Sequence, residues 1–486
     1  MRKLASCFLR VLINFFMKTI LIPINSNFFA RNFLRTDAFK ILKARQDLRV
    51  VLLVPPSKLS YYRKEFGSQQ VIVDNLALTR DSAVENFFRF LERNSIVTNR
   101  VKMDQITALY KRKKEPVLKA TIRFLLRLVN FLAARALYYF GHLGMSWRFL
   151  VRWLYSLVPT HYYVQVFAAY KPDLIFCPTL VWHEDYCLIR EARKSGVKTA
   201  GMIFSWDSFY SKTFFLAYPG HLFVQTPEIA NQAKQLANYP YEIDVVGFPQ
   251  YDSHFQKRGI IPRAEFLKQF GADPAKKLIL YAFSGKAGLD IEFDVLDIMA
   301  KAIRSGEIKG APEVLIRPYP RFDFSEAKLS DLKRRYGFRA AASTSNIGAD
   351  SSADWEMDDR AISLLVNSLA HADLIITMYS TFFIEGAIFN KPLIAVGFDG
   401  FKTRPYPLSA KRFFNWDHLK DLKAQGGISI VSSAEEFIAA INRSLAEPAY
   451  LAAGRGRIVS EHCYFKDGMS GKRLAEALIK ALPRQQ

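Results

Sequence analysis

Short apolar runs rich in β-branched residues alternate with helical patterns along most of this 486-residue chain. In the first half the clearest runs are TILIPI (19–24), RVVLLVPP (49–56), DLIFCPTL (173–180) and HLFVQT (221–226). In the second half they are KLILYAFSGKAG (277–288), EVLIRPYP (313–320), DLIITMYST (373–381) and KPLIAVGFD (391–399). Continuous apolar strands separated by helices are typical of parallel sheets covered on both faces. The alternation therefore predicts an α/β protein with two Rossmann-like domains that face one another across a cleft.

The boundaries follow from breaks in this alternation. A linker with Gly259, Pro262 and the turn-forming sequence GADP (271–274) separates the two halves. We expect a first domain over 17–258, a second over 272–467, and a last helix over 468–486 that crosses back to the first domain. We expect residues 1–16 to form a basic amphipathic lead-in, with translation from Met17 as the alternative, and a helical insertion at about 80–168 to interrupt the first domain.

Positive charge is concentrated in the first third of the chain. Residues 1–170 hold 28 Lys and Arg residues against 9 Asp and Glu residues, whereas the net charge of the whole chain is +23. Such an asymmetry indicates a polyanionic partner. No nucleic-acid recognition module is visible, so we expect an anionic membrane surface rather than nucleic acid.

The insertion has the pattern of a helix that lies in a membrane interface. Lys119, Arg123 and Arg127 fall on one stripe of a predicted helix, and aromatic and aliphatic residues occupy the rest. Charges interrupt every apolar window long enough to span a bilayer. An insertion packed on its own domain, with a solvated arginine face, remains the alternative. Four widely spaced cysteines fit a reducing compartment, so the expected location is cytoplasmic, attached peripherally to the inner face of the membrane.

Polar residues that could bind a donor follow the strands of the second half. Ser380 and Thr381 come where strand 373–378 gives way to a helix, and Glu385 lies one turn further on. Free N–H groups and hydroxyls at such a point bind phosphate, although an ordinary helix cap has the same residues. Arg317 ends another buried strand and is suited to a phosphate, and Ser284 with Lys286 gives a weaker signal.

Candidate catalytic residues follow two strands of the first half. Asp207 lies in SWDSFYSK (205–212), directly after an apolar strand, and a partly buried carboxylate there can act as a general base. His183 opens the preceding helix and is a second candidate base. An Asx-turn at Asp207 and a local hydrogen bond at His183 are the structural alternatives. Other residues expected to line the cleft are Trp206, Ser208 and Lys212.

These segments resemble the GT-B fold of nucleotide-sugar glycosyltransferases. Within that fold, the chain is similar to the group that contains CDP-glycerol glycerophosphotransferases and UDP-N-acetylglucosamine 2-epimerases, over residues 17–480 outside the insertion. The segments that carry the resemblance are ADLIITMYSTFFIEGAIFNKPLIAVGFD, SWDSFYSK and VVGFPQYD. The resemblance implies that Ser380, Thr381 and Glu385 hold the phosphate and ribose of a donor nucleotide, with Lys391 and Asp399 supporting the same loop.

Two departures weaken the phosphotransferase interpretation. The group's Arg/Lys-Pro-His-Pro motif reads RPYP (317–320) here, so Tyr319 replaces a histidine. The Trp-His-Gly motif of glycerophosphotransferases is replaced by Trp206-Asp207-Ser208. Eight residues beyond Glu385 stands Leu393 rather than a second glutamate, which favours an inverting mechanism, and the sequence has no DxD metal motif.

The expected function is therefore a membrane-associated glycosyltransferase of surface-polysaccharide or lipid-linked glycan assembly. Its partners would be a nucleoside-diphosphate sugar, a glycan or lipid-linked acceptor and the membrane, and it would need neither a cofactor nor a metal. The first domain would present the acceptor and the second would bind the donor. A polyol-phosphate transferase, a UDP-sugar epimerase and a catalytically inactive scaffold that binds glycan or nucleotide remain as alternatives.

Overall fold

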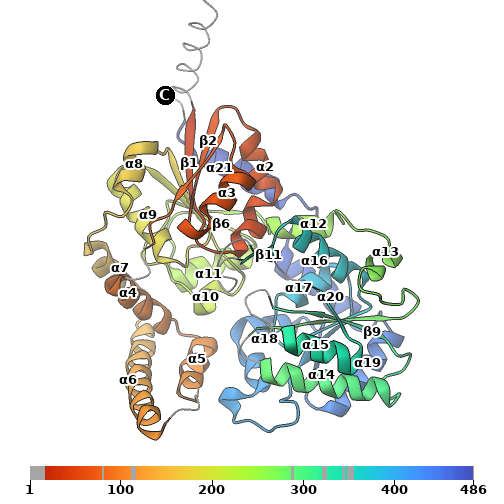
Figure 1. Ribbon diagram of the computed structural model, residues 1–486. Helices are drawn as coiled ribbons and strands as arrows, with labels where there is room; N and C mark the ends of the chain where they lie inside the picture. The colour runs from red at the N-terminus through yellow and green to blue at the C-terminus, as the bar shows by residue number, and fades with distance from the viewer. Residues whose placement is uncertain are drawn as a thin grey trace, which may run out of the picture.

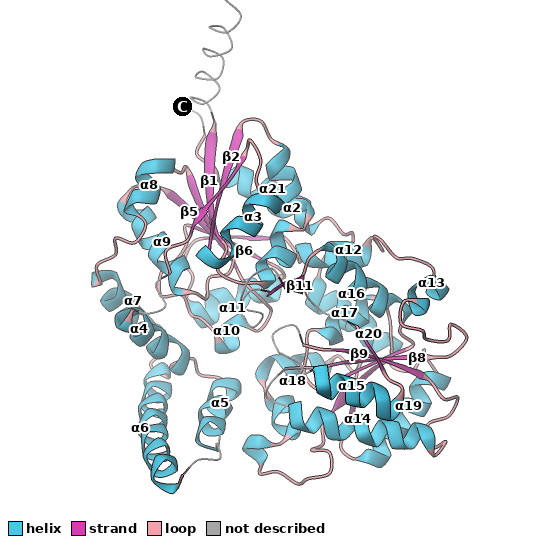
Figure 2. Ribbon diagram, in the orientation of Figure 1, coloured by secondary structure: helices cyan, strands magenta, loops and turns pink. Residues whose placement is uncertain are grey.

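The computed structural model describes residues 17–78, 82–110, 116–285, 289–319, 326–341, 345–346 and 355–484. Each half of the chain builds its own parallel sheet with helices on both faces (Figure 1, Figure 2). The first sheet has the strand order β3-β2-β1-β4-β5-β6-β7, and the main sheet of the second half has the order β10-β9-β8-β13-β14-β15. The prediction of two Rossmann-like domains with the GT-B architecture is confirmed.

The strands are the apolar runs of the sequence. Ile20 in β1 pairs with Val50 in β2 and with Leu174 in β4, which places β1 in the middle of the first sheet. All three side chains are buried. The first sheet consists of β1 (Lys18–Pro23), β2 (Leu48–Val54), β3 (Val71–Asn75), β4 (Leu174–Cys177), β5 (Lys198–Met202), β6 (His221–Val224) and β7 (Glu242–Val245). The second consists of β8 (Leu278–Ala282), β9 (Glu313–Arg317), β10 (Arg339–Ala340), β13 (Leu374–Thr377), β14 (Leu393–Val396) and β15 (Ser429–Val431), beside a small pair of strands, β11 (Ser345–Asn346) and β12 (Trp355–Glu356).

Helices connect these strands in both domains. In the first domain they are η1 (Ala30–Leu34), α2 (Asp37–Ala44), η2 (Pro56–Lys58), α3 (Leu59–Phe66), α9 (His183–Lys194), α10 (Ser208–Ser211), α11 (Pro227–Ala237), η3 (Pro249–Tyr251) and α12 (Asp252–Phe255). In the second they are α13 (Arg263–Lys268), α14 (Leu289–Arg304), α15 (Glu326–Tyr336), α16 (Asp359–His371), α17 (Phe382–Ile388), η5 (Tyr406–Leu408), η6 (Ala410–Asn415), α18 (Asp417–Ala424), α19 (Ala434–Ala446) and α20 (Ala452–Cys463).

The last helix, α21 (Ser470–Ala481), lies in the first domain against α2 (Figure 1). Gly471 permits this contact, because a Cβ atom there would lie only 2.9 Å from the backbone nitrogen of Ala38. The carboxylate of Asp252 accepts hydrogen bonds from the backbone N–H groups of Ser470 and Gly471, at 3.0 and 2.7 Å. These bonds join α12, where the chain leaves the first domain, to the start of α21, where it returns.

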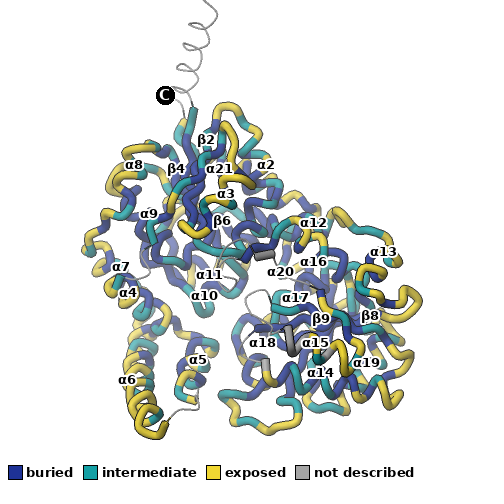
Figure 3. The backbone as a smooth tube through the Cα atoms, viewed as in Figure 1, coloured by how far each residue is buried: buried dark blue, intermediate teal, exposed yellow. Residues whose placement is uncertain are grey.

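The described residues of the insertion form five helices between β3 and β4. They are α4 (Ala83–Asn94), α5 (Asn99–Tyr110), α6 (Val117–Gly141), α7 (Met145–Leu157) and α8 (Val164–Tyr170). The first half of α6 stands away from the sheet, and most of its residues are exposed (Figure 3). Leu118 is 73% exposed and Leu126 is 64% exposed, although both are apolar. Within the described residues, no helix combines the length and apolar character needed to cross a bilayer.

Candidate active site between the two domains

Glu385 joins the two domains inside a buried ionic network. Its carboxylate accepts a 2.7 Å hydrogen bond from Nη2 of Arg31, and Nε2 of His254 lies 3.1 Å from the same oxygen. The Glu385 side chain is only 1% exposed. Burial acts to raise the pKa of Glu385, but Arg31 and His254 outweigh it and lower that pKa to about 2. The residue expected to hold a ribose therefore points toward the first domain in this structure.

Arg317 lies beside this network at the carboxyl end of β9. The residue is 3% exposed, and among the described residues its Nη1 atom has no hydrogen-bond partner. Burial lowers the pKa of Arg317 to about 10, against the attraction of the Glu385 carboxylate. Nε of Arg31 is likewise buried without a partner in the described part of the chain. Two guanidinium groups thus meet one carboxylate, which leaves a net positive charge at the junction of the domains.

Ser380 and Thr381 precede α17, which begins at Phe382, two residues later than the sequence predicted. The Ser380 hydroxyl accepts a 3.2 Å hydrogen bond from the backbone N–H of Phe382, while the Thr381 side chain makes no capping bond. The guanidinium carbon of Arg317 lies 5.9 Å from the centroid of the Phe382 ring. The structure therefore brings together Arg317, the start of α17 and Glu385, and their role in donor binding stays a prediction.

Ser284 has a structural role in this arrangement. Its hydroxyl accepts hydrogen bonds from the backbone N–H groups of Met378 and Tyr379, at 2.9 and 3.0 Å. It also donates to Glu292 at 3.2 Å and lies 2.9 Å from the hydroxyl of Thr377. Ser284 therefore links the loop after β8 to the end of β13, and its hydroxyl has little hydrogen-bonding capacity left for a donor substrate. Lys286, the other candidate in this loop, lies outside the described residues.

Asp207 is held by an ion pair in the first domain. Its Oδ1 atom accepts a 2.6 Å hydrogen bond from Nζ of Lys212 and a second from the Ser205 hydroxyl. Burial would raise the pKa of Asp207, but Lys212 and the other neighbours hold it well below its usual range. A carboxylate this acidic is a weak proton acceptor, so its environment disfavours the expected role of general base. Ser208 is fully buried, and its hydroxyl accepts a 3.2 Å hydrogen bond from Ser205 N–H, which shapes the same turn.

His183 lies apart from Asp207, under the insertion. Its side chain is 7% exposed, and its Nδ1 atom is 3.7 Å from a carboxylate oxygen of Glu85 on α4. That oxygen also accepts a 2.6 Å hydrogen bond from Tyr155 on α7. The imidazole therefore faces the contact between α9 and the insertion, and it does not line the cavity between the domains.

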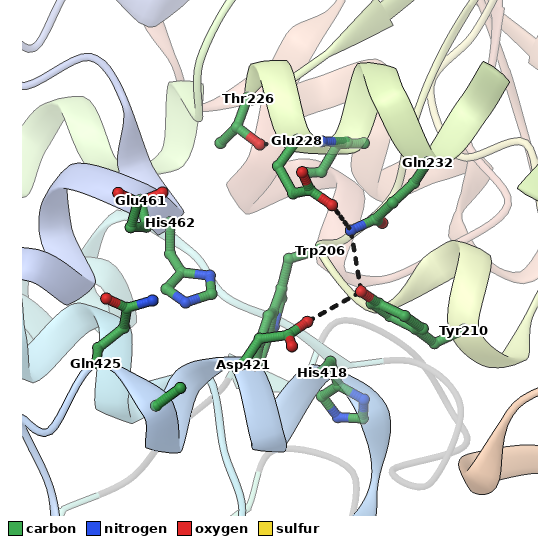
Figure 4. A pocket seen from close by; sticks show the side chains of 12 residues that line it. Trp206, Tyr210, Thr226, Glu228, Gln232, His418, Asp421, Gln425, Glu461 and His462 are labelled. Atoms are coloured by element: carbon green, nitrogen blue, oxygen red, sulfur yellow. Dashed lines mark hydrogen bonds between the residues drawn. The ribbon is translucent and has the colours of Figure 1, made fainter. Parts of the chain in front are cut away.

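That cavity has a volume of about 410 Å³ and is lined by residues of both domains (Figure 4). Trp206 lies at its centre, edge-on to the rings of His418 on α18 and His462 on α20, with centroids at 5.0 and 5.4 Å. Burial lowers the pKa of both histidines to about 4, so both imidazoles are neutral at physiological pH. Sequence reasoning found Trp206 but missed the histidines, because they lie on helices rather than at strand ends.

The basic residues predicted for the membrane lie on the projecting part of α6. Lys119 and Arg123 are exposed and Arg127 is partly buried, with its Nε atom 3.1 Å from the Arg123 carbonyl oxygen. Large apolar side chains of α6 are exposed beside them, including Leu118 and Leu126, and α7 exposes Phe149 (67%) and Trp153 (51%). The alternative of an insertion packed on its own domain does not fit this part of α6.

One group of potential metal ligands occurs within the described residues. Donor atoms of His221, Glu242 and Asp244 lie within 4.8 Å of one another. These residues stand at the amino ends of β6 and β7, at the opposite edge of the sheet from the cavity. The expectation that the chemistry needs no metal remains a prediction.

Solved structures with a similar fold extend over nearly the whole chain. UDP-GlcNAc 2-epimerase of Neisseria meningitidis, bound to UDP-GlcNAc, has a TM-score of 0.51 at 11% identity, covering 95% of this chain and 100% of its own. MnaA of S. aureus, solved with UDP, has a TM-score of 0.52 at 10% identity, with coverages of 97% and 99%. A putative UDP-N-acetylglucosamine 2-epimerase of Listeria monocytogenes gives 0.52 at 12% identity, with 96% of each chain covered.

No curated protein sequence matches the chain significantly. The sequence model of the CDP-glycerol:poly(glycerophosphate) glycerophosphotransferases, in contrast, matches residues 218–480. This match covers more than half of the chain, including the end of the first domain, the whole second domain and α21. The chain therefore belongs to the CDP-glycerol:poly(glycerophosphate) glycerophosphotransferase family, as an enzyme built on the GT-B glycosyltransferase fold.

Proposed function

We propose that the protein transfers a sugar from a nucleoside-diphosphate sugar to a hydroxyl group of a polysaccharide or lipid-linked acceptor. The transfer takes place at the cytoplasmic face of the membrane, with inversion at the anomeric carbon and without a metal ion or other cofactor. The observation that carries the proposal is Arg317, a buried arginine at the carboxyl end of β9 whose Nη1 atom has no hydrogen-bond partner among the described residues.

A buried guanidinium with an unused N–H group is costly unless an anion occupies its free side. Arg31 approaches the same place from the first domain and also has a buried nitrogen without a partner in the described part of the chain. Diphosphate is an anion that both arginines would contact through these free nitrogens, and their charge would stabilise it as the leaving group. Binding it would draw on residues of both domains.

The acceptor hydroxyl attacks the anomeric carbon, the bond from that carbon to the diphosphate oxygen breaks, and the hydroxyl proton passes to a base. Asp207 is unsuited to accept this proton, because Lys212 keeps its pKa low. The neutral imidazoles of His418 and His462 line the cavity beside Trp206 and are the better proton acceptors. Asp207 then serves to orient Lys212 and the turn that carries Trp206.

Thermal unfolding in the presence of different donors tests the proposal. With UDP-, GDP-, CDP- and dTDP-linked sugars, one donor at about 100 times its Kd should stabilise the protein by about 2.7 kcal/mol. Arg317→Met should weaken that donor by about 10- to 100-fold, because one charge-assisted contact to phosphate is lost. Arg443→Met, at an exposed arginine on α19, is the matched control and should leave the shift unchanged. If the donor stabilised wild type and Arg317→Met equally, Arg317 would not belong to the donor site.

The family match favours a second candidate, the transfer of glycerol phosphate from CDP-glycerol. Stabilisation by CDP-glycerol, and by none of the nucleotide sugars, would establish this activity instead. Product analysis separates both transferases from an epimerase, which would convert the sugar without an acceptor. Stabilisation by a donor without any turnover would indicate a scaffold.

The membrane location is supported by the basic and apolar surface of α6. Replacing Lys119, Arg123 and Arg127 with glutamate should weaken binding to phosphatidylglycerol vesicles by at least about 100-fold, at about 1 kcal/mol per basic residue. Vesicle co-sedimentation measures this effect. The control reverses three exposed lysines of the second domain, Lys268, Lys276 and Lys309, and should leave binding unchanged. Equal loss in both variants would show that net charge, and not α6, determines attachment.

A further inference from the structure

The cavity around Trp206 differs in chemistry from the arginine site. Its walls come from α10 and α11 of the first domain and from α18 and α20 of the second (Figure 4). Tyr210 donates a 3.0 Å hydrogen bond to Asp421, which links the two domains across the cavity. Its volume of about 410 Å³ is in the range of small-molecule sites.

Buried hydrogen-bonding atoms without partners line this cavity. Gln232 is 7% exposed, and its amide nitrogen donates to Glu228 and to the Tyr210 hydroxyl, each at 3.2 Å. Its Oε1 atom, however, has no partner among the described residues. The same holds for Nδ1 of His418, which is 6% exposed, and for Nε2 of His462. The Gln232 oxygen calls for a ligand that supplies a hydrogen-bond donor, and each imidazole nitrogen accepts or donates according to its tautomer; hydroxyl groups can satisfy all three atoms.

The charges at the cavity disfavour an anionic ligand. Carboxylates of Glu228, Asp421 and Glu461 stand at its exposed rim. None of the 12 residues drawn as its lining is a lysine or an arginine. A phosphate brought here would meet the rim carboxylates and find no lysine or arginine in the lining, whereas a neutral polyhydroxylated group would find both hydrogen-bonding atoms and aromatic surface.

We propose that the cavity around Trp206 holds a neutral, hydroxyl-rich unit of the acceptor, a sugar ring or polyol, with its hydroxyl groups donating to Gln232, His418 and the rim carboxylates. This inference rests on the proposed function and specifies its acceptor. A poly(glycerophosphate) chain, the acceptor in the family's description, is excluded from this cavity by its phosphates. The cavity would thus hold the neutral part of the acceptor, and the arginine site would hold the anionic diphosphate of the donor.

Saturation-transfer NMR with simple probes tests the assignment on the full chain. The methyl glycosides of glucose and N-acetylglucosamine serve as neutral probes, and sn-glycerol 3-phosphate serves as the anionic one. At least one neutral glycoside should bind at least about 10-fold more tightly than the phosphate. Gln232→Leu should weaken that glycoside by about 10-fold, and the control Gln70→Leu, at a glutamine outside the cavity, should not. Combining Asp421→Asn with Glu461→Gln, both at the exposed rim, should strengthen binding of the phosphate.

The donor shift of the wild-type protein separates this inference from the proposed function. If a donor stabilises the protein but no neutral glycoside binds, the cavity is not an acceptor subsite, and the donor site stands. Tighter binding of sn-glycerol 3-phosphate, or of the cationic methyl glucosaminide, than of both neutral glycosides would also overturn the assignment. If a neutral glycoside binds and Gln232→Leu weakens it, while no donor raises the thermal stability of the protein, the assignment of the cavity stands and the proposed transfer fails.

Discussion

Replacing Glu385 with alanine is expected to lower the free energy of unfolding by about 3–5 kcal/mol, because it leaves a buried charge without its partner. The carboxylate accepts a 2.7 Å hydrogen bond from Arg31, whose side chain is 11% exposed. Without this carboxylate, the guanidinium of Arg31 would remain buried near another positive charge, the guanidinium of Arg317. Denaturation in urea, followed by tryptophan fluorescence at constant pH, measures the loss.

A matched control comes from an exposed ion pair of the same kind. Asp37 pairs with Arg258 at 2.7 Å, but their side chains are 24% and 48% exposed. Asp37→Asn should therefore change the free energy of unfolding by less than about 1 kcal/mol. The double variant Arg31→Met with Glu385→Ala should lose less than the sum of the two single variants, because it removes both charges of the pair. A loss at Glu385 as small as that at Asp37 would contradict a buried contact between the domains.

The pH dependence of the Glu385 contribution has a defined sign. The folded-state pKa is about 2, below the ordinary value of 4.5, so the folded protein stabilises the charged form. The contribution is fully present above pH 4.5 and is lost as the pH falls toward 2. The difference in stability between wild type and Glu385→Ala should therefore shrink in acid, and urea midpoints across this range would show it.

The sheets could be predicted because buried parallel strands are recognisable locally. Most strands are short apolar runs, although β7 (EIDV) and β10 (RA) are not, and the helices between such runs leave only one kind of sheet connection open. The start of α17 shows the limit of this reasoning. Ser380 looked like the first helical residue, but its hydroxyl accepts from Phe382 N–H, so the helix begins two residues later.

The candidate site could be predicted only where its residues follow strands. Arg317 and Glu385 were found in this way, but the partners of Glu385 lie 354 residues away at Arg31 and 131 residues away at His254. No local pattern predicts such contacts. His418 and His462 were missed for the same reason, since α18 and α20 bring them to Trp206 only in the folded chain. The ion pair of Asp207 with Lys212, in contrast, joins residues only five positions apart in the sequence. This ion pair argues against Asp207 as the general base.

The second large effect is expected at Glu292, a buried carboxyl group that has no counter-charge among the described residues. The residue on α14 is fully buried, and its Oε1 atom accepts hydrogen bonds from the backbone N–H and hydroxyl of Ser284, at 2.9 and 3.2 Å. Burial raises the pKa of Glu292 to about 8, although the bonds from Ser284 oppose this rise. At neutral pH the group is therefore mostly protonated in the folded protein, whereas in the unfolded chain it is charged above pH 4.5.

Between pH 4.5 and 8 the folded protein binds a proton on Glu292 that the unfolded chain has released. The contribution of Glu292 to the free energy of unfolding is therefore fully present below pH 4.5 and is lost as the pH rises toward 8. The total change is about 4–5 kcal/mol, at about 1.4 kcal/mol per pH unit. Glu292→Gln, which keeps the shape and stays neutral, should abolish this fall and be more stable than wild type above pH 8. Urea denaturation from pH 5 to 9 measures it, with Glu476→Gln on α21 as the exposed control. Parallel pH profiles for wild type and Glu292→Gln would mean that Glu292 is already charged at neutral pH and that water reaches its carboxyl group.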